Sequence, residues 1–140
     1  MRRAYSHLYV HLVWATWERL PLITPQIEKR LYGAIRAKCR ELGCEPLAVG
    51  GTADHVHLLV RLLPSVSVSQ LVKGIKGASS HLMTHEVTPG EFFKWQGGYG
   101  AFSVGRESVS RVADYIAHQK EHHHEGKASK NWELADVGEN

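Results

Sequence analysis

The order of hydrophobic and polar positions changes period along the chain. From Tyr5 to Trp14 apolar and polar residues alternate, which predicts a strand. One face of this strand, the core face, would hold Leu8, Val10, Leu12 and Trp14. The other face, outside the core, would hold His7, Tyr9, His11 and Val13. After a loop from Trp17 to Leu22, Thr24-Pro25 has the residues of a helix start, and a helical apolar pattern continues from there to Gly43.

The rest of the chain repeats the alternation of strands and helices. The next helix begins near Ser67, where Ser67 and Gln70 fit a capping box, and is broken at Thr88-Pro89-Gly90. The other predicted elements are a strand over Glu45–Val49, a turn at Gly50-Gly51-Thr52, a strand over Ala53–Val60, a loop with a short strand over Phe92–Val104, and a helix over Ser108–Glu125.

This element order predicts an α+β fold. Helices interspersed with a few antiparallel strands favour a two-layer sandwich, an antiparallel sheet with helices packed on it, of ferredoxin-like type. We expect one domain over residues 1–126 and a polar tail over residues 127–140.

Composition narrows the class of protein only a little. The 140 residues are 43% hydrophobic and 22% charged, as in ordinary globular domains. No apolar stretch approaches the roughly 18 residues of a membrane span, and no signal peptide is apparent, so we expect a cytoplasmic protein without a membrane partner. The net charge of +3 suits an anionic partner without specifying one.

The most informative motif is His55-Val56-His57. Residues two apart on a strand point to the same face, so both imidazoles would lie side by side and begin a metal site. Tyr115 and Gln119, four residues apart, would share one face of the last helix. Such a tyrosine is more often a packing residue, but if the helix packs near this strand, a phenol nucleophile would meet a phosphate-binding cation.

Other polar residues have a functional and an ordinary interpretation. For His11 the sequence favours a half-buried ring bonded to backbone, with a site-lining role as the alternative, and for His118 it favours a solvated helix face over a role in the site. Side chains that fit DNA contacts, or are merely solvated or packed, are Lys73, Lys76, Tyr99, Arg106, Arg111 and Lys120.

Three segments together resemble the single-tyrosine HUH transposases, which include small bacterial insertion-sequence enzymes and REP-associated tyrosine transposases. They are Asp54-His55-Val56-His57, Trp95–Val104 and Tyr115-Ile116-Ala117-His118-Gln119. The resemblance implies that His55, His57 and Gln119 bind Mg²⁺ or Mn²⁺ and that Tyr115 is the nucleophile. It also implies cleavage and rejoining of single-stranded DNA at hairpin-containing ends through a 5′-phosphotyrosine, by a homodimer whose active sites can be shared between subunits.

Two other functions are compatible with the same residues. A zinc hydrolase built on His55 and His57 would need a carboxylate base nearby, and alternation along the strand places Asp54 on the opposite face. A non-mobile protein that binds or processes REP-type hairpins would keep the DNA partner without transposition.

Overall fold

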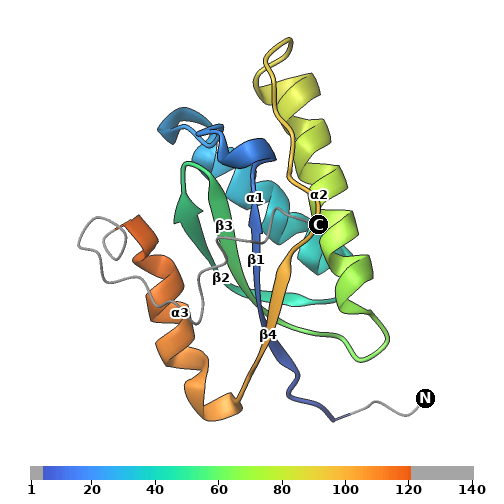
Figure 1. The fold of residues 1–140 in the computed structure, drawn as a ribbon. Helices are drawn as coiled ribbons and strands as arrows, with labels where there is room; N and C mark the ends of the chain where they lie inside the picture. Colours follow the sequence, from blue (N-terminus) through green and yellow to red (C-terminus); the bar gives the residue numbers. More distant parts are fainter. Residues whose placement is uncertain (1–4, 121–140) are drawn as a thin grey trace.

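The computed structural model describes residues 5–120 of the chain (Figure 1). The predicted tail and the end of the last predicted helix lie outside these residues. The helices are α1 (Pro25–Glu41), α2 (Val68–Leu82) and α3 (Val109–Ala117), and the strands are β1 (Tyr9–Ala15), β2 (Glu45–Thr52), β3 (His55–Arg61) and β4 (Gly100–Val104). Shorter turns are η1 (Trp17–Arg19), the π-helical η2 (Met83–Val87) and η3 (Arg106–Ser108).

The four strands form one antiparallel sheet in the order β2-β3-β1-β4. In its centre β1 pairs with β3, with Ala15 opposite His55 and Val13 opposite His57. The predicted α+β fold with an antiparallel sheet is therefore confirmed. The end of β1 therefore lies beside the start of β3, and this pairing positions the histidine motif.

Helices cover both faces of the sheet (Figure 1). On one face Leu12, Val56 and Leu58 pack with residues of α1 and α2 in the main core. On the other face Leu59 packs with Val112, Tyr115 and Ile116 of α3 in a second core. The expectation that only one face of the first strand belongs to the core is wrong at the far end of that strand, because His11 and Val13 on its other face are buried too.

Three boundaries differ from the sequence-based expectation. The first strand begins at Tyr9 rather than Tyr5. The glycines at 50 and 51 lie within β2, which stays paired with β3 up to Thr52 and His55, so that the hairpin turn falls at Ala53-Asp54. The last predicted helix is interrupted after Ala117, because His118 has the non-helical angles φ −111° and ψ 30°, and residues 119–120 are helical again.

The predicted helix starts are confirmed. Pro25 begins α1. The Ser67 hydroxyl accepts the Gln70 amide at 3.1 Å while the Gln70 side chain accepts the Ser67 amide at 2.9 Å, which completes the capping box. Within residues 5–120, no helix combines the length and apolar character that crossing a bilayer requires.

Candidate active site

The candidate site is built around the histidine pair of β3. His55 and His57 leave the α3-facing side of β3, and their ring centroids lie 5.1 Å apart at an angle of 70°. Both rings are almost fully buried, at 3% and 0% exposure. The structure therefore brings the two imidazoles together on one face, as the alternation along the strand predicts.

His55 is held from its Nδ1 side by the hairpin turn. Its Nδ1 lies 2.8 Å from Oδ1 of Asp54 and 2.9 Å from Oγ1 of Thr52. An Nη atom of Arg19 lies 3.3 Å from the same Asp54 oxygen. The hydrogen bond from His55, together with the Arg19 guanidinium, lowers the pKa of Asp54 to about 2. The expectation that Asp54 points to the opposite face is wrong, because Asp54 belongs to the turn and does not follow strand alternation.

His57 is held from its Nδ1 side by another strand. Nε2 of His11, on β1, lies 2.8 Å from Nδ1 of His57, and the two ring centroids are 5.0 Å apart. His11 is completely buried, and the ring of Phe102 on β4 lies 5.9 Å from it. The expectation of a half-buried His11 is wrong, because the residue is fully buried. Since β1 and β3 are neighbours, the side chain of His11 meets His57.

Tyr115 and Gln119 approach the pair from α3. The ring of Tyr115 is 7% exposed and stands edge-on to His57, with centroids 5.9 Å apart. Gln119 is 1% exposed, and its amide donates to the Tyr115 carbonyl oxygen at 3.4 Å. Gln119 follows the helix break at His118, so the two do not share one continuous helix as predicted. The structure nevertheless brings phenol and imidazoles together on one side of the sheet.

Gly50 determines how closely α3 approaches the sheet. A Cβ atom at this position would collide with the carbonyl oxygen of Ile116, the residue after Tyr115. Gly50 and Gln119 also line one cavity of about 260 Å³ at the end of α3. The turn expected at Gly50-Gly51-Thr52 gives no hint of this contact. The signal for it in the sequence is a glycine inside a strand, which often marks close backbone approach.

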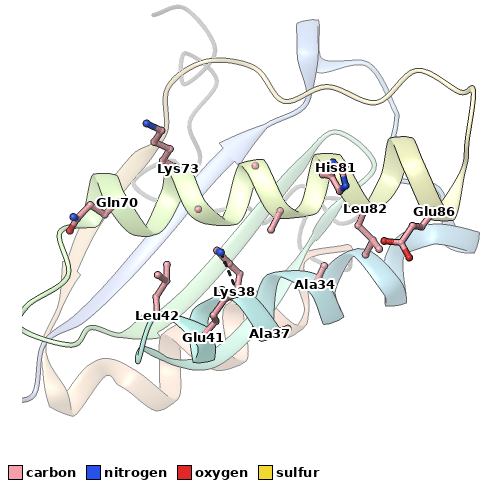
Figure 2. Close-up of a pocket in the computed structure, with 13 residues that line it drawn as sticks. Ala34, Ala37, Lys38, Glu41, Leu42, Gln70, Lys73, His81, Leu82 and Glu86 are labelled. Atoms are coloured by element: carbon pink, nitrogen blue, oxygen red, sulfur yellow. Dashed lines mark ion pairs between the residues drawn. The ribbon is translucent and has the colours of Figure 1, made fainter.

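One predicted DNA contact has a structural role in this chain. The ammonium of Lys76 donates to the carbonyl oxygens of Gln96 at 2.8 Å and Gly98 at 2.7 Å, and so ties α2 to the loop before β4. Burial lowers the pKa of Lys76 to about 8. Lys73, three residues earlier, instead lines an exposed groove of about 860 Å³ between α1 and α2 (Figure 2), on the opposite face of the sheet from the histidines.

The remaining predicted contacts lie on the surface around α3 and β4. Lys120 forms an ion pair with Glu28 of α1 at 2.7 Å, beside the cavity that Gln119 lines. His118 donates through Nδ1 to the carbonyl oxygen of Asp114 at 2.8 Å, which places it at the end of α3 outside the buried histidine cluster. Exposed side chains that the structure does not join to the pair are Tyr99, Arg106 and Arg111.

Three sequence comparisons each match this chain to transposases. Residues 4–119 match the family model described as transposase IS200 like. The chain is 31% identical over 117 residues to the transposase of insertion sequence element IS200 from Salmonella typhimurium, which covers 79% of this chain and 76% of that protein. It is 24% identical over 129 residues to the ISDra2 transposase TnpA of Deinococcus radiodurans, with 85% and 91% covered.

Solved structures extend the likeness to three dimensions. A crystal structure of a Deinococcus radiodurans R1 protein assigned as a transposase matches with a TM-score of 0.64 and 27% sequence identity, covering 85% of this chain and 96% of that one. The structure of a REP-associated tyrosine transposase bound to a REP hairpin matches with a TM-score of 0.63 and 20% identity, covering 91% and 74%. At 20% identity this second likeness concerns the fold.

Proposed function

Because this chain belongs to the IS200-like transposase family, we propose that it cleaves and rejoins single-stranded DNA through a covalent phosphotyrosine on Tyr115. The observation that carries the proposal is the edge-on approach of Tyr115 to His57, with ring centroids 5.9 Å apart. A candidate nucleophile and a pair of candidate metal ligands, which lie far apart in the sequence, thus meet in one buried cluster. A phenol with only a packing role would not require two buried histidines beside it.

The residues present fit a divalent cation. Nδ1 of His55 and Nδ1 of His57 each have a hydrogen-bonding neighbour, Asp54 and His11, which is how metal-binding imidazoles are commonly oriented. Among residues 5–120 no group of three His, Cys, Asp or Glu side chains is suited to a metal, and the amide oxygen of Gln119 is the third ligand in our proposal. Bound there, Mg²⁺ or Mn²⁺ would polarise the phosphate and favour attack by a phenol.

The chain's own residues then account for strand transfer. The Tyr115 oxygen attacks the phosphorus, a new P–O bond forms, and the bond to the DNA 3′ oxygen breaks. The phenol loses a proton and the departing oxygen gains one, so no proton is consumed overall. The 5′-phosphate stays esterified to Tyr115, and attack by that 3′ hydroxyl or another reverses the step. Because the ester conserves the energy of the phosphodiester, rejoining needs no ATP.

The proposed partner is single-stranded DNA with hairpins. Two observations support this partner: the structural neighbour is bound to a REP hairpin, and this chain carries a net positive charge. A homodimer, which the family resemblance implies, is part of the same proposal.

Covalent trapping tests this function. The protein is incubated with a panel of single-stranded hairpin oligonucleotides and Mg²⁺ or Mn²⁺, and the adduct is detected by denaturing electrophoresis. We expect Tyr115→Phe to abolish the adduct while hairpin binding remains, because the ring and its packing are retained. Tyr5→Phe is the matched control and should form the adduct, because this exposed tyrosine precedes the end of β1 that pairs with Arg61, far along the strand from the Ala15–His55 pair.

Each contrary outcome has a distinct meaning. An adduct that persists in Tyr115→Phe removes Tyr115 as nucleophile. Hairpin affinity without cleavage under either metal would instead identify a non-catalytic, REP-type hairpin-binding protein. One tightly held zinc ion per chain with hydrolysis of a small substrate would favour the zinc hydrolase.

A further inference from the structure

We infer that His11 is a positioning residue that fixes the tautomer of His57 and thereby selects Nε2 of His57 as the metal-binding nitrogen. This inference rests on the proposed metal site. It assigns a role to a side chain on a different strand, outside the three segments that carry the family resemblance.

The first step is geometric. Nε2 of His11 and Nδ1 of His57 are 2.8 Å apart, a distance at which one nitrogen must donate a hydrogen and the other must accept it. Neither ring is exposed to solvent. The tautomers of His11 and His57 are therefore coupled: the hydrogen on this shared edge belongs to one ring or the other.

The second step follows from the chemistry of a ligand. A neutral imidazole binds a cation through the nitrogen that lacks hydrogen. If His57 donates through Nδ1, its Nε2 keeps the lone pair and the ring can be a ligand. If His11 donates instead, a neutral His57 carries its hydrogen on Nε2 and cannot bind a metal through that atom. His11 supports the metal site only as the acceptor, which places its own hydrogen on Nδ1.

The third step is the local construction around His11. The register of the sheet places Leu59 opposite His11 and Val13 opposite His57, so the two histidines are diagonal neighbours on the same face. Phe102 from β4 lies against the other side of the His11 ring, with centroids 5.9 Å apart. A neutral ring suits this position, because a carboxylate acceptor would carry an uncompensated charge into a fully buried layer.

His55 shows the matching arrangement at the other ligand. Its Nδ1 faces the Asp54 carboxylate at 2.8 Å, and an ionised carboxylate can only accept, so His55 donates through Nδ1. The same orientation at His57 makes Nε2 the binding atom of both rings. Chemically different neighbours thus orient the two ligand rings: a half-buried carboxylate orients His55, and a fully buried imidazole orients His57.

Nitrogen-15 NMR of the histidine rings in the metal-free, full-length protein tests the tautomer directly. We expect hydrogen on Nδ1 and a lone pair on Nε2 for His57 in the wild type. We expect this preference to be lost in His11→Phe and retained in His11→Gln, whose side-chain oxygen can accept at the same place. The reverse tautomer of His57 in the wild type would overturn the inference, whatever the activity of the protein.

Mn²⁺ affinity, measured by titration with electron paramagnetic resonance, gives the second readout. Loss of an outer hydrogen-bond partner typically weakens metal binding by about 10–100-fold, which is the decrease expected for His11→Phe, with His11→Gln close to the wild type. Phe102→Leu is the matched packing control, because it loosens the contact with His11 and keeps the hydrogen bond. An equal loss in Phe102→Leu and His11→Phe would show that packing, not the hydrogen bond, is responsible.

The failure of this inference is distinguishable from failure of the proposed function. If the wild type binds Mn²⁺ and His57→Ala does not, but His11→Phe binds as well as the wild type, only the role of His11 is refuted. If the wild type binds no Mn²⁺ at this pair, the proposed metal site fails, and the NMR measurement still decides whether His11 fixes the tautomer.

Discussion

The ring of Tyr115 stands edge-on to the ring of His57 of the same chain, at an interplanar angle of 82°. The two residues are joined by the packing of α3 against the sheet, where Tyr115 and Ile116 share a core with Leu59 of β3. A single chain therefore brings its own candidate nucleophile to its own candidate metal ligands. This arrangement bears on whether a dimer would exchange its tyrosines.

Cleavage within one chain predicts an absence of complementation. We expect Tyr115→Phe and His57→Ala each to be inactive, and their mixture to stay inactive, because no chain in it holds both groups. The measurement is formation of the covalent adduct after the two variants have been mixed and allowed to exchange subunits. Recovery of adduct in the mixture would show that the tyrosine acts on the partner's histidines.

Gly50→Ala is expected to destabilise the fold and displace α3. The added methyl group would meet the carbonyl oxygen of Ile116, a backbone atom that cannot turn aside. Overpacking of this kind typically lowers the free energy of unfolding by about 1–3 kcal/mol. Chemical denaturation measures the loss, and adduct formation should fall with it because Tyr115 precedes Ile116.

Gly77→Ala is the matched control for that change. Gly77 lies in the middle of α2, and a Cβ atom there would meet no atom within 4 Å. Alanine in a helix is more favourable than glycine by roughly 0.5–1 kcal/mol, so this variant should be slightly more stable than the wild type. Equal destabilisation at both positions would contradict a specific contact between Gly50 and α3.

The buried ammonium of Lys76 should make the stability of the fold depend on pH in the alkaline range. Burial lowers its pKa in the folded chain to about 8, from an ordinary value of 10.5. Between these two pH values the unfolded chain binds the proton and the folded chain does not, so stability rises with pH across this window. We expect the free energy of unfolding of the wild type, relative to Lys76→Met, to increase from about pH 8 to about pH 10.5. A flat difference would place the pKa of the ammonium near its ordinary value.

The ion pair between Lys120 and Glu28 is expected to contribute little stability. It joins the segment after α3 to α1, but Lys120 is 59% exposed, and exposed pairs are typically worth about 0.2–1 kcal/mol. A double-mutant cycle with Glu28→Gln and Lys120→Gln should give a coupling energy in that range at low salt and less at high salt. A larger coupling that is insensitive to salt would mean that this contact anchors the segment that carries Gln119.

Local features of the fold were accessible from the sequence. Sequence patterns predicted the four strands and three α-helices found in residues 5–120, although not the short helical turns η1, η2 and η3. The Ser67 capping box and the Pro25 helix start were confirmed because they depend on neighbours a few residues away. The shared face of His55 and His57 follows from the geometry of one strand in the same way. The expectation of a turn at Gly50 and Gly51 of β2 is wrong, because glycine occurs both in turns and in strands that another backbone approaches closely.

By itself, the sequence determined the types of the elements, the paired histidines, and the spacing of Tyr115 and Gln119. Only the tertiary structure decided what surrounds them: that β1 lies beside β3 and brings His11 to His57, that the hairpin turn directs Asp54 to His55, and that Gly50 admits the backbone of α3. Periodicity records which side of an element is apolar, and it does not record which element packs there. The neighbours of the histidine pair come from strand order and helix docking, which depend on packing across the whole chain.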